Sequence, residues 1–312
     1  MKNPSMAAQP SDAQASRAQS AGTHRLSILL VNHNGMRYLE SCLESIHRFA
    51  PGETEVILVD NASMDGSLEA AEKNFPWLRI VRSERNLGFA GGNNLAASNA
   101  GGSFLLLLNT DTLLLEPIAP VVDWLENHRS CGAVTINMLD GERKPSACTG
   151  RFPTPLRLAS FGSMLISPGQ FGGQESYPVD WVQGSFLLVR ADLWRSLSGL
   201  DERYFMYGED VDLCRRIHDA GLCCAYLPGW QYVHFGGSAP SRFPAQACGF
   251  AAYAERHMAA PRRLLCIFVL YAGCLLRAAF YLARGMAPGR AIDRARAAAS
   301  WHAIEALMHR AG

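Results

Sequence analysis

The sequence predicts an α/β fold with a mostly parallel, doubly wound sheet. From Leu26 onward, short apolar runs alternate with segments of helical spacing, as in successive β-α units. In such sheets, ligands bind beyond the carboxyl ends of the strands. Polar residues follow three predicted strands at this position, namely Asn32, Asp60, Asn61, Asn109 and Asp111. Asn and Asp are also ordinary turn residues, but their recurrence at three strand ends favours a ligand site.

The elements of the first half follow one another closely. Residues 26–31 form an apolar run that stops at a turn sequence beginning with Asn32, which is typical of a buried parallel strand. Helical spacing over residues 38–49 places Leu39, Leu43 and Ile46 on one face. The remaining predicted elements are strands at residues 55–60, 78–81 and 104–108, and helices at residues 67–75 and from Gly88.

The second half is less regular. Residues 133–178 are rich in Pro, Gly and Ser, so we expect a variable, loop-rich region there. Beyond it, the pattern predicts strands at residues 181–189 and 226–233 and helices at residues 192–197 and 210–220.

Composition narrows the function classes. The chain has 312 residues, of which 48% are hydrophobic, and a formal net charge of +1, so no general basic field suggests a nucleic-acid partner. Nine cysteines without a CxxC pair are typical of reduced, buried thiols in a cytosolic protein. Residues 1–24 lack the apolar stretch of a secretory signal and are predicted to be a disordered leader.

Four motifs occur in order along the chain: VDNASMDG at residues 59–66, NLGFAGGNN at 86–94, LNTDT at 108–112 and GEDVDLCRR at 208–216. In this order they resemble the family 2 inverting glycosyltransferases of the GT-A fold, and most of all the bacterial rhamnosyltransferases of cell-envelope polysaccharide synthesis. The resemblance covers about residues 26–240. It implies a GT-A domain over residues 25–245 that transfers a sugar from a nucleoside diphosphate.

The resemblance implies a donor site at the strand ends. In the resembled family, the acid at the position of Asp60 bonds the nucleotide base or ribose, and a carboxylate can accept two such hydrogen bonds. Ser63 shapes the neighbouring loop, although it could instead cap the next helix. The glycine-rich segment at Gly88 lies against the nucleotide-sugar in that family, and a helix N-terminus favours phosphate. The expected donor-binding residues are Asn32, Asp60, Asn61, Ser63, Arg85, Gly88, Asn93 and Asn109.

Asn109-Thr110-Asp111 occupies the place of the family's DxD motif. Two carboxylates at that spacing hold Mg²⁺ or Mn²⁺, which bridges the donor phosphates. Here the first position is Asn, so only one carboxylate remains. We therefore expect Asp111 to bind the metal and Asn109 to contact ribose or sugar. His234 is a second candidate ligand, because some related enzymes place a histidine there on the metal or diphosphate. The alternative is a structural role, which is the more common one for a lone histidine.

Inverting transfer needs a general base to take the proton of the acceptor hydroxyl. The resemblance assigns this role to the acidic motif, with Asp210 as the first candidate and Glu209 as the second. Alternatively, these acids only complement the dipole of the following helix. Trp181 and Gly184 lie where the family has its acceptor-side loop, and Trp181 could either stack on a sugar or fill the core.

Residues 264–283 are strongly apolar and, as a helix, are about 30 Å long, close to the thickness of a bilayer core. Basic residues flank this stretch, which suits anionic headgroups: Arg262, Arg263, Arg284 and Arg290. Residues 246–312 are therefore predicted to form a helical, membrane-associating segment with an interfacial or re-entrant placement rather than a full span. The alternative is a buried helix of the soluble core.

Together, these features predict a metal-dependent glycosyltransferase that is peripheral or monotopic on the cytoplasmic side of the inner membrane. The best donor from the resemblance is dTDP-L-rhamnose, and the expected acceptor is a lipid-linked or polysaccharide glycan. A nucleotide-binding oxidoreductase is disfavoured, because GxGxxG is missing after the first strand. A catalytically inactive homologue that acts as a membrane-associated assembly factor is favoured only by Asn109.

Overall fold

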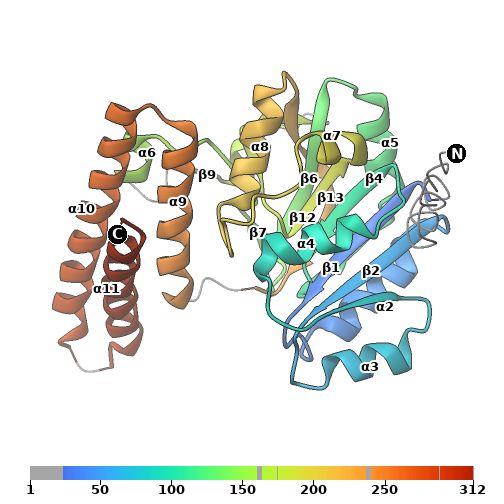
Figure 1. Ribbon diagram of the computed structural model, residues 1–312, viewed down its shortest axis with the longest axis horizontal. Coiled ribbons are helices and arrows are strands. Elements are labelled where there is room, and N and C mark those ends of the chain that lie inside the picture. The colour runs from blue at the N-terminus through green and yellow to red at the C-terminus, as the bar shows by residue number, and fades with distance from the viewer. Residues whose placement is uncertain (1–23, 160–163, 174, 237–239, 288, 312) are drawn as a thin grey trace, which may run out of the picture.

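The computed structural model describes residues 24–159, 164–173, 175–236, 240–287 and 289–311. The predicted leader therefore lies almost entirely outside the described residues. A large mixed sheet forms the centre of the larger part of the molecule, and a group of long helices stands beside it (Figure 1).

Strand order in the large sheet is β10-β13-β6-β12-β4-β1-β2-β3. Strands β3, β2, β1 and β4 are parallel, whereas β12 runs antiparallel to both of its neighbours, β4 and β6. The sheet is thus mixed, with a parallel half that matches the predicted doubly wound arrangement. The strands are β1 (Leu26–Asn32), β2 (Thr54–Asn61), β3 (Arg79–Ser83), β4 (Phe104–Leu108), β5 (Thr112–Leu114), β6 (Cys131–Leu139), β7 (Pro145–Ser146), β10 (Tyr177–Val179), β12 (Phe186–Arg190) and β13 (Cys223–His234).

Helices connect and flank these strands (Figure 1). The apolar runs of β1 and β4 are buried along nearly their whole length, because helices and neighbouring strands enclose them. This explains why both strands read as continuous hydrophobic segments rather than as alternating ones. The flanking helices are α2 (Leu39–Phe49), α3 (Ser67–Asn74), α4 (Gly88–Ser98), α5 (Ala119–Asn127), α7 (Ala191–Ser196) and α8 (Glu209–Asp219).

Two expectations for the second half of the chain are wrong. The supposedly loop-rich region begins with β6, whose nine residues are all buried between β12 and β13. Its Gly132, Thr135 and Asn137 hide the strand in the sequence, since tertiary burial decides its conformation. The strand expected at residues 181–189 is also broken. Its start, β11 (Trp181–Val182), belongs to a separate sheet with β8 (Thr149–Gly150) and β9 (Leu165–Ile166).

The C-terminal region is a bundle of α9 (Phe243–His257), α10 (Ala260–Gly285) and α11 (Ala291–Ala311), with the short α6 (Pro155–Ala159) against it (Figure 1). The predicted domain boundary at residue 245 falls within the first turn of α9. The three helices share a second core in which small side chains predominate. It contains Phe243, Ala247, Ala251, Ala254, Cys266, Leu270, Cys274, Ala299, Ala303, Ile304 and Leu307.

Helix α10 combines the two alternatives drawn from the sequence. One face packs into the bundle through Cys266, Leu270 and Cys274, while most of the helix surface stays outside it. By length and composition α10 could cross a membrane, and most of its apolar stretch is not buried within the protein. It is therefore a packed helix with a second, exposed apolar face.

Candidate active site

The ends of β1 and β2 lie side by side, as parallel neighbours must, with Asn32 opposite Asp60. The Asn32 side chain is fully buried, and its Nδ2 donates to the hydroxyls of Ser67 at 2.8 Å and Ser63 at 3.0 Å. The same nitrogen lies 3.4 Å from Asp60 Oδ1. The predicted donor residues Asn32, Asp60 and Ser63 thus form one polar cluster at the carboxyl edge of the sheet.

Asn61 connects this cluster to the glycine-rich loop. Its Nδ2 donates to the carbonyl of Gly88 at 3.1 Å, and its Oδ1 accepts from the Leu87 amide at 2.8 Å. Gly88 has a φ of +73°, and a Cβ there would lie 2.2 Å from the carbonyl oxygen of Phe205. Only glycine fits this close backbone approach. The loop before α4 is thereby joined to the loop before α8.

Two predicted donor contacts lie apart from the cluster. Arg85 is exposed in the loop between β3 and α4. Asn93 is buried within α4, where its Nδ2 donates to the Phe89 carbonyl one turn earlier. Within the described part of the chain, neither residue hydrogen-bonds to Asp60 or Ser63. The motif alone could not predict where Arg85 and Asn93 point, because a glycine-rich helix start has no clear apolar face from which to orient the helix.

Asn109, Asp111 and His234 come together although β4 and the end of β13 are far apart in sequence. Strand β5 carries the chain back and pairs with β13, so that Thr112 lies opposite His234. His234 Nε2 is 3.2 Å from Asp111 Oδ1 and 3.4 Å from Asn109 Nδ2. A Cβ on Gly236 would lie 2.7 Å from both Asp111 Oδ2 and His234 Nε2. Only glycine therefore fits this close approach of the backbone to the two candidate ligands.

Opposing effects act on the Asp111 carboxyl. Burial by itself raises its pKa, but the hydrogen bond and charge of His234, with the charge of Arg242, outweigh burial and lower that pKa. Asp111 is thus held as a carboxylate. Sequence reasoning missed Arg242, which directly precedes α9. A basic residue shortly after His234 was the available signal.

A strained turn presents the two candidate acids. Tyr207 has a φ of +73° and Gly208 a φ of +99°, and α8 begins immediately after them. A positive φ is unfavourable for tyrosine and persists only where the surroundings enforce it. Asp210 Oδ2 accepts from the Gly184 amide at 3.0 Å, and its Oδ1 accepts from the Val211 amide at 2.8 Å. The predicted base and the predicted acceptor-side Gly184 are thus in direct contact.

Glu209 and Asp210 are both displaced from ordinary carboxyl behaviour. Burial raises the pKa of Asp210, and burial together with the neighbouring Asp210 charge raises that of Glu209 well above its usual value. Glu209 Oε2 is buried and, among the described residues, has no hydrogen-bond partner. A carboxylate with a raised pKa is a better general base than an exposed one. Three acids in the first turn of α8 do complement the helix dipole, as the alternative supposed. The dipole does not explain why the pKa values of Glu209 and Asp210 are raised.

Tyr207 links the acidic turn to the surroundings of Asp111 and Arg242. Burial raises the pKa of its phenol, the Arg242 charge opposes this, and the charges of Glu209 and Asp111 add to the rise. All three charged groups therefore act on one side chain. Sequence reasoning also missed Tyr207, whose strained backbone leaves no trace in a motif.

Trp181 does not have the stacking role considered for it. Its indole is buried in the main core, and Nε1 donates to the Arg151 carbonyl at 3.1 Å. A Cβ on Gly150 would lie within 2.5 Å of the ring, so the indole fills the space that this glycine leaves. The core-filling alternative is the observed one.

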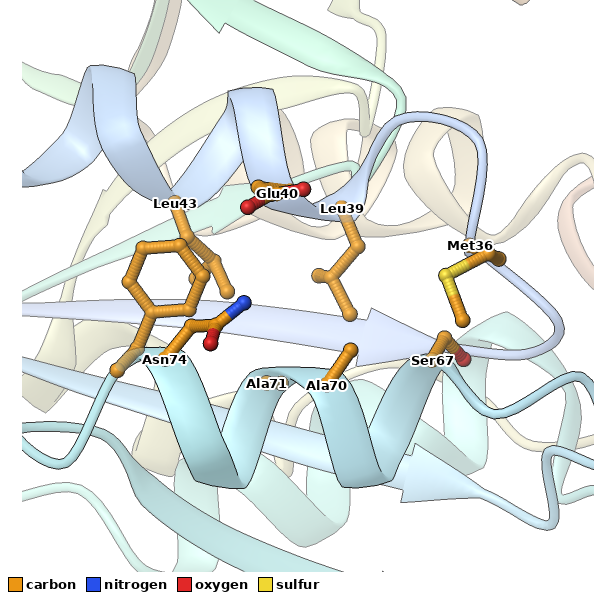
Figure 2. A pocket seen from close by; sticks show the side chains of 9 residues that line it. Met36, Leu39, Glu40, Leu43, Ser67, Ala70, Ala71 and Asn74 are labelled. Atoms are coloured by element: carbon orange, nitrogen blue, oxygen red, sulfur yellow. The ribbon is translucent and has the colours of Figure 1, made fainter.

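Figure 2 shows a small hollow between α2 and α3, lined chiefly by apolar side chains such as Leu39, Leu43 and Phe75. Its lining contains the single carboxylate Glu40 and none of the predicted site residues. This hollow is a gap between two helices, and the polar groups suited to chemistry lie at the sheet edge instead.

Comparison with known proteins agrees with this geometry. Residues 27–165 match the glycosyl transferase family 2. The chain carries a family 2 glycosyltransferase domain. The chain is similar to the N-acetylglucosaminyl-diphospho-decaprenol L-rhamnosyltransferase of Mycobacterium tuberculosis, with 29% identity over 251 residues that cover 72% of this chain and 80% of that protein. It is also similar to the rhamnosyltransferase WbbL of Escherichia coli, with 26% identity over 221 residues, 67% of this chain and 82% of WbbL.

The fold comparison gives the same result. The mannosyltransferase PcManGT from Pyrobaculum calidifontis, solved with GDP-Man and Mn²⁺, superposes with a TM-score of 0.58 over 94% of this chain and 89% of its own. At 17% identity, this likeness concerns the fold alone. The predicted family and the predicted GT-A fold are confirmed.

Proposed function

We propose that the chain transfers L-rhamnose from dTDP-L-rhamnose to a lipid-linked or polysaccharide acceptor with inversion at the anomeric carbon. The observation that carries this proposal is the environment of Tyr207: this residue of the acidic turn lies under the charges of both Arg242 and Asp111, while Asp210 of the same turn is held by the Gly184 amide and Asp111 is paired with His234. Transfer needs a base on one side of the sugar and groups that neutralise the leaving diphosphate on the other.

The donor's nucleoside fits the cluster at the ends of β1 and β2. Asp60 is oriented by Asn32 behind it and by the Ser63 amide, which lies 3.3 Å from its Oδ2. A carboxylate held in this way can accept hydrogen bonds from a base or a ribose. Asn32 is fully buried, so we assign it to support Asp60 rather than to touch the donor.

A divalent cation fits beside Asp111. Mg²⁺ takes one or two protein carboxylates plus substrate phosphates and waters. Asp111 with His234, beside which Gly236 places no side chain, meets that need. No group of three or more His, Cys, Asp or Glu residues with metal-site geometry occurs among the described residues, so the diphosphate would complete the coordination. When bound, the metal would neutralise charge on the departing diphosphate. Arg242 adds a permanent positive charge there.

Asp210 would remove the proton from the acceptor hydroxyl as that oxygen attacks the anomeric carbon. Its two carboxylate oxygens each accept a backbone hydrogen bond, which fixes the plane of the group. Burial raises the pKa of Asp210 and so keeps this carboxylate basic. Glu209 is buried next to it, its Oε2 has no hydrogen-bond partner among the described residues, and its own pKa is raised by burial and by the Asp210 charge.

The acceptor would be lipid-borne, and the exposed apolar face of α10 would meet the bilayer. The arginines at both ends of that helix suit an anionic surface on the cytoplasmic side. The M. tuberculosis relative is named for a diphospho-decaprenol acceptor, which supports an acceptor of this kind.

A catalytically inactive assembly factor is the second candidate function, and Asn109 favours it. The intact base geometry at Asp210 and the carboxylate state of Asp111 argue for catalysis instead.

The proposal is tested by thermal unfolding of the purified chain with dTDP-, UDP- and GDP-sugars, each with Mn²⁺ and with EDTA. A donor at one hundred times its dissociation constant stabilises the native state by about 2.7 kcal/mol. We expect the largest shift with dTDP-L-rhamnose and Mn²⁺. A larger shift with another nucleotide-sugar would identify that compound as the donor in place of dTDP-L-rhamnose. The absence of a shift with every nucleotide-sugar would refute donor binding.

A further inference from the structure

We propose that helix α9 of the C-terminal bundle positions the catalytic base through two contacts with the turn that carries it. One contact is the packing of Gly249 against Tyr207 and Gly208, and the other is the ion-pair cluster around Asp212. This inference rests on the proposed role of Asp210. Gly249, Asp212 and His257 are thus positioning residues, because they act on the base through the backbone of the turn and of α8.

Gly249 brings the backbone of α9 against the catalytic turn. A Cβ at this position would lie 2.2 Å from the Tyr207 carbonyl oxygen and 3.5 Å from the Gly208 nitrogen. From the other side, a Cβ on Gly208 would lie 3.2 Å from the Cα of Gly249. Glycine inside a helix is unfavourable by roughly 0.5–1 kcal/mol relative to alanine. Here the close approach requires it.

Asp212 is the polar half of the contact. It is fully buried, two residues beyond Asp210 in the first turn of α8. Its Oδ1 lies 2.7 Å from His257 Nε2 and 3.2 Å from Arg256 Nε, both on α9. Its Oδ2 accepts from Arg216 Nε of α8 at 2.8 Å. A buried carboxylate must be paired, and α9 supplies two of these three partners.

The same helix also holds the chain before the turn. Arg256 forms a second ion pair with Asp201, at the start of the loop that leads to Tyr207. Ion pairs with α9 therefore hold the chain before the strained turn, at Asp201, and after it, at Asp212, and Gly249 packs against the turn itself. Strained φ values persist only where surrounding contacts enforce them. Helix α9 provides such contacts through Gly249, Arg256 and His257.

Because α9 shares its other face with α10 and α11, the bundle and the base are mechanically linked. The bundle is then part of the catalytic apparatus, in addition to any contact it makes with lipid. An alternative role for the cluster is fold stability alone. That role predicts lower thermal stability with unchanged turnover of the folded protein.

The experiment uses the full chain with four substitutions. Gly249→Ala adds the methyl group that meets Tyr207, and His257→Ala removes a partner of Asp212. His257→Gln keeps a donor near the position of Nε2. Gly229→Ala is the matched control, because a Cβ at Gly229 meets nothing within 4 Å. kcat and donor KM are measured well below the unfolding temperature, and amide hydrogen exchange is followed across residues 205–212.

We expect Gly249→Ala and His257→Ala to lower kcat by up to about 100-fold, the cost of a misplacement near 1 Å, with donor KM nearly unchanged. His257→Gln should recover most of the activity, and Gly229→Ala should match the parent chain. Exchange should accelerate across residues 205–212 and stay unchanged in β1 and β2.

Normal kcat together with normal exchange in Gly249→Ala would overturn the proposal. So would lower thermal stability of the His257→Ala chain with unchanged turnover. If the parent chain transfers no sugar, the proposed function fails, whereas the exchange comparison still decides whether α9 holds the turn.

Discussion

The exposed face of α10 gives a prediction whose size follows from the structure. Leu264, Phe268, Leu275 and Leu282 recur at spacings of four and seven residues, so they share one face. Leu264 is 63% exposed and Phe268 is 67% exposed. Complete burial of such a side chain stabilises by about 1.5–3 kcal/mol. Moving the exposed two-thirds into lipid should therefore contribute about 1–2 kcal/mol for each residue.

Replacing both Leu264 and Phe268 by Gln should thus weaken binding to lipid vesicles by about 2–4 kcal/mol, or roughly 30- to 1,000-fold. Sedimentation with vesicles that contain anionic phospholipid measures this, and circular dichroism checks that the helices remain. Met64→Gln is the control, because this side chain is 91% exposed but lies in the loop between β2 and α3. Equal binding by the parent chain and the double variant would refute the assignment of this face to lipid.

Four further predictions concern the site. Glu209→Gln should stabilise the fold near neutral pH. The pKa of Glu209 in the folded state lies above its unfolded value of about 4.3, so the folded state keeps a proton that the unfolded state loses. The stability of the parent chain therefore falls as pH rises from the unfolded to the folded pKa. Denaturant unfolding between about pH 4 and 8 should show a weaker fall in the variant, and an unchanged fall would contradict this reasoning. Because burial also raises the pKa of Asp210, the acidic limb of the kcat profile should lie above about pH 3.9, and a limb below that value would exclude Asp210 as the base. Asp111→Ala should weaken nucleoside diphosphate binding far more in Mn²⁺ than in EDTA, whereas Asn109→Asp should preserve activity or tighten metal binding. Equal weakening of the Asp111→Ala variant in both solutions would mean that Asp111 contacts the donor without a metal.

The sequence predicted the parallel half of the sheet and the positions of Asp60, Asp111 and Asp210 because these depend on local signals. Buried parallel strands are continuous apolar runs, and the acids stand directly at strand or helix ends. Such features are visible within a window of about ten residues.

Features that depend on distant segments were missed or misassigned. Strand β6 is buried by its neighbours rather than marked by its own residues. Trp181 fills the space left by Gly150, and the charge of Arg242 acts on Asp111 only because the chain returns to this site after crossing the sheet. Gly249 is an ordinary-looking helical residue until its contact with Tyr207 is known. No local pattern encodes these contacts.

The central claim is inverting transfer with Asp210 as the base. Its most direct test incubates the parent chain and Asp210→Asn with dTDP-L-rhamnose, Mn²⁺ and a polyprenyl-diphosphate-linked N-acetylglucosamine, and measures the rate and the anomeric configuration of the product. We predict a product of inverted configuration, formed about 10²- to 10⁴-fold more slowly by the variant, while the variant still binds the donor. A retained configuration, or parental turnover in Asp210→Asn, would contradict the account.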